Sequence, residues 1–426
     1  MKHTNIRHTF IKYVSLNIIG MIGLSCYILA DTFFVARGIG ANGLTALNLA
    51  IPIYSFIHGI GLMIGMGGAT RFAISKREQV FTQATGYAML AACLFVAVGL
   101  FFSTQLATML GANADTLQNT SIYLKTILCF APMFLLNNVL ICFVRNDGNP
   151  KLSMAAMLIG SLSNIVLDYL FIFPCNMGMF GAAFATGIAP VISLIILSAH
   201  FIKKQNTFRL RTQKLQIKAL WDITSLGLSA LIIELSSGIV MIVFNSIILS
   251  IAGNTGVAAY GIIANIALVV ISVFTGISQG VQPIISLCYS AQNHGDIQKV
   301  LKYGAITTIS FAILVYGVFA AFAHPVVAAF NKDANMQLAE IATMGLRIYF
   351  TCFAFAGINI LLATYYSSVE KPKNAFTISV LRGFVIIIPT AFLLSGLFGL
   401  TGVWITMPVT ELIVFLFSAG VLARKK

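Results

Sequence analysis

Long apolar runs follow one another along almost the whole chain. The run LSMAAMLIGSLSNIVLDYLFIF, from Leu152 to Phe173, has twenty-two residues and only one charge, at Asp168. A helix of this length crosses the hydrocarbon core of a bilayer. Of the 426 residues, 58% are hydrophobic and only 9% are charged, whereas soluble domains carry roughly 25% charged residues. We therefore predict an integral membrane protein without a separate soluble domain.

The spacing of the apolar runs predicts an all-α, polytopic membrane fold with twelve transmembrane helices. The expected spans are residues 10–36, 46–72, 80–104, 118–143, 152–173, 178–201, 220–250, 256–290, 299–330, 336–367, 375–396 and 399–423. Twenty-one of the 26 Lys and Arg residues fall at the termini or on the loops after even-numbered spans. Since cytoplasmic loops are enriched in Lys and Arg, both termini are expected in the cytoplasm. The net charge of +14 is spread over short loops, so it indicates orientation and not a nucleic-acid surface.

The two halves of the chain resemble each other in the same order. GANGLTAL (40–47) is similar to GNTGVAAY (253–260), and GNPKLS (148–153) is similar to EKPKNA (370–375). Such ordered similarity indicates an internal duplication. It predicts two six-helix bundles, arranged as parallel repeats around a central cleft.

The longest basic loop lies close to the middle of the chain and sets the expected domain boundaries. We predict an N-lobe at residues 1–202, a cytoplasmic linker at 203–219 and a C-lobe at 220–426.

Acidic side chains inside the apolar runs are the candidate functional residues. A carboxylate in the bilayer core is costly unless it is protonated, paired or facing a watery cavity. Asp31, in ILADTFFV, and Asp168 lie in spans without a nearby Lys or Arg. Asn164 lies one helical turn before Asp168, and Tyr27 one turn before Asp31, so both could add oxygen atoms. We interpret the two acids as a site for H⁺ or Na⁺; a purely structural contact between helices is the alternative.

Three charged residues in later spans and one histidine allow two interpretations each. Glu234 and Glu411 are central in their spans, and Arg382 is their candidate partner. A structural pair remains open beside a role in substrate binding or second coupling. His58 is interpreted as a satisfied or cavity-facing histidine rather than a proton relay. None of the seven cysteines shows metal-type spacing.

Six segments, taken in order, carry a resemblance to a known family. They are ADTFFVARGIGANGLTALNLAIP (30–52), VRNDGNPK (144–151), SNIVLDYLFIF (163–173), MGMFGAAFAT (177–186), GISQGVQPIISLCYSA (276–291) and SVEKPKNAFTISVLRGFVIIIP (368–389). Together they are similar to the multidrug and toxic compound extrusion (MATE) family, prokaryotic DinF-like branch. The resemblance extends over essentially all twelve spans. It implies export of amphiphilic, often cationic, compounds by antiport against H⁺ or Na⁺.

The resemblance also implies roles for individual residues. The family's coupling network, which would hold a bound Na⁺, falls on Asp31, Asn164, Asp168 and Thr186. A cavity-lining amide falls on Asn137, beside Asn138. Two positions depart from the family: Leu16 stands where many relatives have a proline, and the run TCFAFAGINILLATYY lacks the acid that others carry in span 10. Coupling in the N-lobe is therefore favoured.

The expected function is cation-coupled multidrug efflux by alternating access, without enzymatic activity, in the plasma (bacterial inner) membrane. The candidate residues of the substrate cavity are Asn137, Asn138, His58, Glu234, Glu411 and Arg382. No cofactor is expected apart from H⁺ or Na⁺ as the coupling ion. The expected partners are small organic substrates and the lipid bilayer, with no nucleic acid, and the chain is expected to be a monomer. A lipid-linked oligosaccharide flippase is the alternative, but it would want a cationic cavity, for which the spans offer mainly Arg382 and Arg347.

Overall fold

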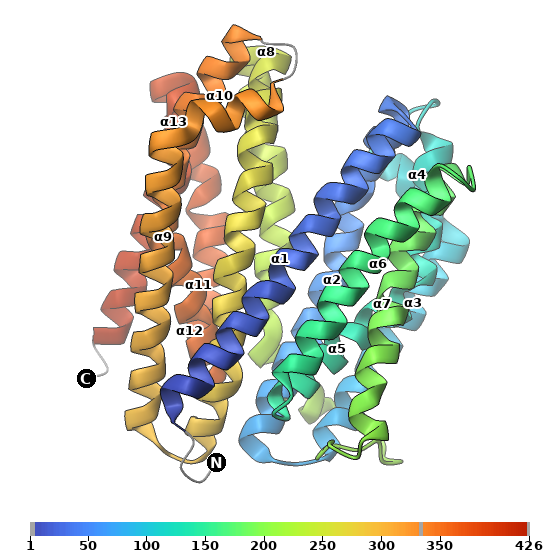
Figure 1. Cartoon of the computed structure of the whole chain (residues 1–426), viewed down its shortest axis with the longest axis vertical. Helices are drawn as coiled ribbons and strands as arrows, with labels where there is room; N and C mark the ends of the chain where they lie inside the picture. The colour runs from blue at the N-terminus through green and yellow to red at the C-terminus, as the bar shows by residue number, and fades with distance from the viewer. Residues whose placement is uncertain (1–4, 332–334, 424–426) are drawn as a thin grey trace. The chain divides into compact units, whose positions relative to one another are not determined.

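The computed structural model describes residues 5–331 and 335–423, and this part of the chain consists of helices and their connections, without a β-strand (Figure 1). The elements in chain order are α1 (Ile6–Gly38), α2 (Ala41–Ser75), α3 (Gln79–Met109), α4 (Leu117–Cys129), α5 (Ala131–Asn146), α6 (Pro150–Ile172), α7 (Gly178–Ile202), α8 (Ile217–Ser290), α9 (His294–Phe330), α10 (Met336–Tyr349), η1 (Phe350–Cys352), α11 (Phe353–Ser368), α12 (Pro372–Val380), η2 (Leu381–Val385) and α13 (Ile387–Ala423). The predicted all-α class is confirmed.

The helices account for the twelve predicted spans. Six of them, α1, α2, α3, α6, α7 and α9, are single apolar helices long enough to cross a bilayer. The fourth span is the pair α4 and α5, which bends by 48°. A non-helical residue, Gly253, divides α8 into two spans. Gly399 likewise divides the stretch from α12 through η2 and α13 into two. The tenth span runs from α10 to α11.

Backbone geometry repeats between the two halves as the predicted duplication requires. Gly40, before α2, and Gly253, inside α8, have positive φ angles of 87° and 61°. Gly178, at the start of α7, and Gly399, inside α13, have φ angles of 55° and 57°. These left-handed conformations are accessible to glycine because it has no Cβ. The same break therefore recurs at the same place in each half.

The structure divides into two compact units. The N-unit contains Ser15–Leu235 and Ser286–Asn293. The C-unit contains the described residues of Met1–Val14, Ser236–Ile285 and His294–Lys426. The first part of α8 thus groups with the N-unit. The predicted division into lobes at residues 1–202 and 220–426 stays a prediction.

Close backbone contact explains why the first part of α8 belongs to the N-unit. A Cβ placed on Gly67 of α2 would lie 1.9 Å from the carbonyl oxygen of Ile223, and one on Gly227 of α8 would lie 1.8 Å from that of Met63. Only glycine allows two helices to approach this closely. α2 and α8 are therefore packed backbone to backbone from residue 223 onward.

The first helix is unbroken at Leu16, the position at which the resemblance would place a proline. α1 runs from Ile6 to Gly38 without a proline, so Leu16 leaves the helical hydrogen bonds intact. The next residue, Asn17, accepts a 2.7 Å hydrogen bond from Nη1 of Arg145, which is fully buried. This contact ties α1 to α5 within the N-unit.

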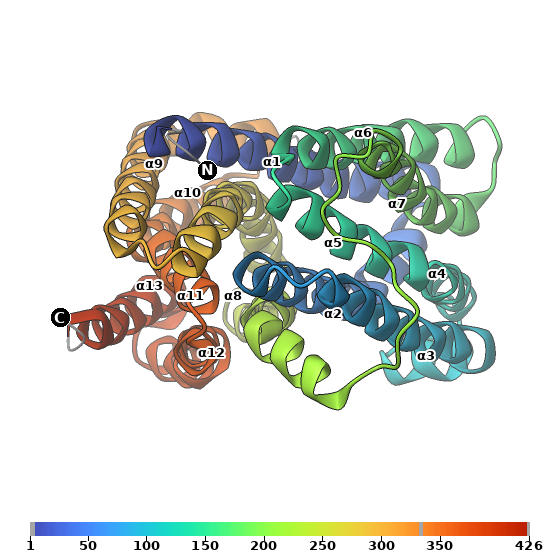
Figure 2. The same cartoon turned by 90° about the horizontal axis from the view of Figure 1, so that it is seen from below.

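The linker after α7 is an ordered strap, which we define as residues 205–216. Figure 2 shows it running as an extended segment between α7 and α8. Phe208 is fully buried and lies against four other phenylalanine rings. Gln83 of α3 donates to the carbonyl oxygen of Lys214 over 2.9 Å and accepts from the Gln216 N–H over 2.9 Å. Both ends of the strap are thus fastened to the N-unit.

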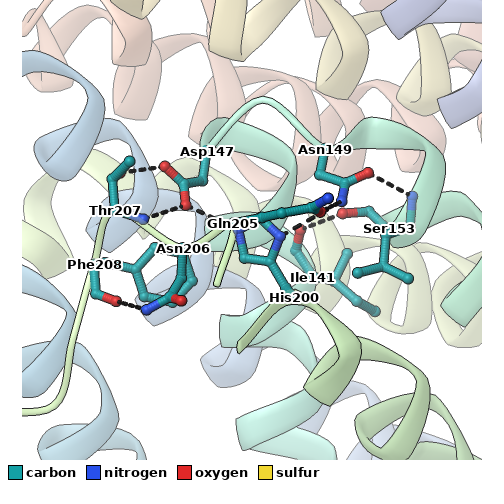
Figure 3. Close-up of polar contacts among 10 residues, drawn as sticks. Ile141, Asp147, Asn149, Ser153, His200, Gln205, Asn206, Thr207 and Phe208 are labelled. Atoms are coloured by element: carbon teal, nitrogen blue, oxygen red, sulfur yellow. Dashed lines mark hydrogen bonds and ion pairs between the residues drawn. The ribbon is translucent and has the colours of Figure 1, made fainter. Parts of the chain in front are cut away.

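Asp147, which follows α5, holds the beginning of the strap (Figure 3). Its Oδ2 accepts from the Thr207 backbone N–H over 2.8 Å and pairs with His200 Nε2 over 2.9 Å, while Oδ1 accepts from the Thr207 hydroxyl. Asn149 adds a 3.0 Å hydrogen bond to Gln205 and caps α6 through the Leu152 N–H. A single carboxylate therefore holds α7 and the strap together.

We expect Asp147→Asn to loosen the strap. Hydrogen bonds to a charged group contribute about 1.5–3 kcal/mol each, so the loss of the carboxylate charge weakens three of them at once. Limited trypsin digestion should cut faster at the exposed Arg209 and Arg211. Asp296→Asn is the matched control, since that acid makes an exposed contact with Lys299. Equal cleavage rates in wild type and Asp147→Asn would contradict this account of the strap.

Candidate functional site

Asp31 on α1 and Asp168 on α6 are buried together in the N-unit. Their exposed fractions are 7% and 0%. α1 can pack tightly along α6, because a Cβ on Gly23 would already lie 2.9 Å from Leu158 Cδ1. Close to the two acids, the rings of Phe34 on α1 and Tyr169 on α6 have centroids 6.2 Å apart. Two acids that are far apart in sequence thus share one buried environment.

Asn164 positions Asp168 through its amide. With its nitrogen toward the acid, Asn164 donates to Asp168 Oδ2 over 3.0 Å and accepts from the Thr186 N–H over 3.2 Å. In this orientation the amide nitrogen donates to the carboxylate and the amide oxygen accepts from the N–H, so both groups have a suitable partner. The Thr186 hydroxyl in turn donates to the Ala182 carbonyl oxygen over 3.1 Å. The three residues expected from the sequence around Asp168 are therefore in contact.

Each acid keeps an oxygen atom without a partner. Within residues 5–331 and 335–423, Oδ1 of Asp31 and Oδ1 of Asp168 make no hydrogen bond. Neither acid forms an ion pair in the same part of the chain. A buried carboxylate in this situation has to be neutralised by a proton or by a bound cation. The geometry therefore suits a site that takes up a positive ion.

Three tyrosines complete the surroundings of the acids. The hydroxyl groups of Tyr27 and Tyr54 are 2.6 Å apart, and the charge of Asp31 acts on both. Tyr123 of α4 is buried near the Thr186 side chain and both acids. Of these, only Tyr27 was expected from the sequence.

A pattern in the sequence could have identified Tyr54 as a site residue, whereas no pattern identifies Tyr123. Tyr54 precedes His58 by one turn of the same span, so the pair forms a polar stripe that sequence reading could have noticed. Tyr123, in SIYLKTIL, has no comparable signal. Its role depends on how α4 is rotated relative to α7, which sequence periodicity does not specify.

A second polar group lies next to Tyr54. His58 is stacked on the Tyr54 ring, with centroids 6.0 Å apart and an angle of 15°. Asn138 approaches His58 Nδ1 over 3.3 Å. The charge of Glu234 acts on Tyr54. Asn137 is half-buried, and its Oδ1 has no partner among the described residues. Four of the residues predicted for the substrate cavity are therefore in the N-unit.

The other two predicted residues form an ion pair in the C-unit. Arg382 Nε donates to Glu411 Oε1 over 2.7 Å, and Asn359 donates to Oε2 over 2.7 Å. Exposed fractions of 11% for Arg382 and 1% for Glu411 make this a buried pair. Arg382 lies in a π-helical turn, η2, which widens the helix at that point. Glu411 is thus neutralised by a basic partner, unlike Asp31 and Asp168.

Comparison with known sequences gives a family match over most of the chain. The MatE family model matches residues 17–170 and 228–393. Multidrug export protein MepA of Staphylococcus saprophyticus is 27% identical over 405 residues, covering 93% of this chain and 88% of that protein. Multidrug export protein MepA of Staphylococcus aureus (strain MSSA476) is 29% identical, covering 92% and 88%.

Solved structures agree with the fold. A MATE transporter crystallised in complex with MaL6 superposes with a TM-score of 0.91, at 22% identity, covering 99% of this chain and 97% of that one. An outward-facing multidrug resistance MATE family transporter of the MOP superfamily has a TM-score of 0.88 at the same identity and coverage. At this level of identity, the likeness concerns the fold alone.

Proposed function

Because the chain belongs to the MatE family of transporters, we propose that it exports amphiphilic, cationic organic compounds by antiport against H⁺ or Na⁺ bound at Asp31 and Asp168. In this proposal it works by alternating access in the plasma membrane, with both termini in the cytoplasm. The multidrug export proteins that it resembles support export of drugs. They do not favour the flippase alternative.

The observation that carries the proposal is the buried pair of acids, each with an unpartnered oxygen and without a basic neighbour in the described residues. Glu411 with Arg382 shows what a buried structural ion pair looks like in this chain. Asp31 and Asp168 lack that compensation. Their charge is balanced only when an ion arrives from outside the protein.

The oxygen atoms around the acids fit a proton better than a sodium ion. Hard metal cations are bound by several oxygen atoms at once. The Asn164 oxygen accepts from the Thr186 N–H, and the Thr186 hydroxyl donates to the Ala182 carbonyl oxygen. Oδ1 of each carboxylate, by contrast, makes no hydrogen bond within the described residues. A proton needs only one of them, so H⁺ is the coupling ion that we propose first.

Antiport follows if the ion and the substrate each weaken the binding of the other, since coupling between two sites is reciprocal. A proton bound from the outside neutralises the acids and favours release of the organic cation. Its later release to the cytoplasm restores the negative charge. Exchange of one H⁺ for one monovalent organic cation moves no net charge, so the proton concentration gradient drives it. A second inward charge would add about 2.3 kcal/mol per 100 mV of membrane potential.

Reconstituted protein tests the proposal directly. Purified chain in liposomes is given ethidium, and either a proton gradient or a sodium gradient is imposed in the absence of the other. We expect ethidium movement against the proton gradient, and collapse of that movement on adding an uncoupler. Movement driven by sodium alone would replace H⁺ with Na⁺ as the coupling ion. Movement that is the same with no gradient, or in empty liposomes, would overturn the proposed antiport.

A further inference from the structure

We propose that the Tyr27–Tyr54 hydroxyl pair couples the ion site to a binding position for the organic cation at Glu234 and the neighbouring aromatic rings. The inference rests on the proposed antiport and identifies the residues through which the ion and the cargo would influence each other. Every contact used here lies within the N-unit.

On one side, the hydroxyl pair belongs to the ion site. Tyr27 lies one turn before Asp31 on α1, and its hydroxyl is 2.6 Å from that of Tyr54 on α2. An O–H···O contact this short is a strong hydrogen bond. Since the charge of Asp31 acts on both tyrosines, the pair responds to whether an ion is bound.

On the other side, Glu234 of α8 lies against α2 close to Tyr54, at Gly59. The charge of Glu234 acts on Tyr54. Glu234 is half-buried and makes no hydrogen bond or ion pair within the described residues. It reaches α2 because Gly59 lacks a side chain: a Cβ there would be 3.3 Å from Glu234 Cβ. A half-buried acid without a basic neighbour is available for a cationic ligand.

The rings near Glu234 suit an organic cation more than a metal ion. Tyr54 is stacked on His58 and meets Phe134 edge to face, with centroids 5.6 Å apart. Aromatic faces attract organic cations, and the attraction increases when water is excluded. The Asn138 amide nitrogen lies 3.3 Å from His58 Nδ1.

Two hydrogen-bonded hydroxyl groups have two arrangements. Either hydroxyl can be the donor. If Tyr54 donates to Tyr27, the Tyr27 proton is free to turn toward Asp31; if Tyr27 donates to Tyr54, the Tyr54 proton is free to turn toward Glu234. A charged Asp31 favours the first arrangement, which leaves Glu234 uncompensated and able to hold the organic cation. A neutralised Asp31 favours the second, in which the Tyr54 O–H points toward Glu234 and weakens its hold. Uptake of the ion is thereby linked to release of the cargo.

The other groups around Tyr54 do not supply this link. Besides Asp31, Tyr27 and Glu234, the titratable side chains that face it are His58, on its own helix, and Tyr123 of α4. Both remain in place in Tyr54→Phe and Tyr27→Phe, so a proton dependence that they alone supplied would persist in these variants.

Tyr54→Phe isolates the hydroxyl, because it keeps the ring that stacks on His58 and meets Phe134. Ethidium affinity of the purified protein is measured by fluorescence at low and at high proton concentration, without sodium. In the wild type we expect the affinity to fall on acidification by about 5–150-fold, the usual range of coupling between sites. In Tyr54→Phe we expect the two affinities to become equal while ethidium still binds.

Matched variants make the result specific. Tyr87→Phe removes a hydroxyl from a half-buried tyrosine of α3 and should leave the wild-type ratio unchanged. Tyr27→Phe breaks the same hydroxyl pair from α1 and should abolish the ratio, so it serves if Tyr54→Phe does not fold. Glu234→Gln should weaken ethidium binding at both proton concentrations.

The failures of the two proposals can be told apart. If the affinity of the wild type does not depend on proton or sodium concentration, the proposed antiport itself is wrong. If the wild type shows the dependence and both tyrosine variants keep it in full, only the role of the hydroxyl pair is overturned. If ethidium binds Glu234→Gln as well as it binds the wild type, the organic cation is not held at Glu234.

Discussion

Ion-driven export is expected to fall by about tenfold or more when Asp168 is replaced by asparagine, because the coupling free energy disappears with the charge. Asparagine has the shape of aspartate but cannot take up a proton or balance a bound cation. The Asn164 amide can still donate to the new oxygen in place of Asp168 Oδ2. The fold should therefore survive, since the change removes an uncompensated buried charge. Uptake of ethidium into proteoliposomes under an imposed proton gradient measures the effect.

Asp115→Asn is the control for this experiment. Asp115 lies in the exposed turn before α4, so its replacement should leave gradient-driven uptake unchanged. Asp31→Asn should reproduce the loss, since both acids occupy the same buried environment. Wild-type uptake by a correctly folded Asp168→Asn protein would remove Asp168 from the coupling site.

Glu411→Gln is expected to cost the C-unit about 3–5 kcal/mol of folding stability, which is typical of breaking a buried ion pair by neutralising one partner. Glutamine retains the size of the side chain and can still contact Asn359. It leaves the Arg382 guanidinium 89% buried beside a neutral group, as its 11% exposed fraction requires. The unfolding midpoint in mixed detergent micelles should fall accordingly.

A double variant separates charge from packing in this pair. Replacing both residues, as Arg382→Met with Glu411→Leu, removes both charges and should restore much of the lost stability. Glu340→Gln, at an exposed position of α10, should have little effect. If the single Glu411→Gln variant is as stable as wild type, the pair is not a structural contact, and a role in transport becomes the better interpretation.

The helical spans show how much of the fold could be predicted from the sequence. The seven cysteines are all free. A helix that crosses a bilayer satisfies its own backbone hydrogen bonds, so length and hydropathy alone predict where it begins and ends. The matched left-handed glycines Gly40 and Gly253 were also readable, because the surrounding motifs recur in each half. The energetic cost of placing Asp31 and Asp168 in apolar runs could also be predicted from the sequence.

Which side chains contact one another could be predicted much less well from the sequence. The sequence offered Arg382 as a partner for Glu234 or Glu411 alike, and the structure pairs it with Glu411. It did not indicate that Gly67 and Gly227 bring the first part of α8 against α2. It treated the linker as a basic loop, although Phe208 is buried among aromatic rings.

The physical reason is that the position of a span depends on local sequence, whereas contacts between side chains depend on residues far apart in the chain. Crossing a membrane depends on the residues of one segment and on the thickness of the bilayer, so the chain determines it locally. Which side chains meet depends on how each helix is rotated about its axis and how closely its glycines let a neighbour approach. Tyr54, Tyr123 and Phe208 acquire their partners only through that packing, so the tertiary structure alone decided what surrounds the two acids.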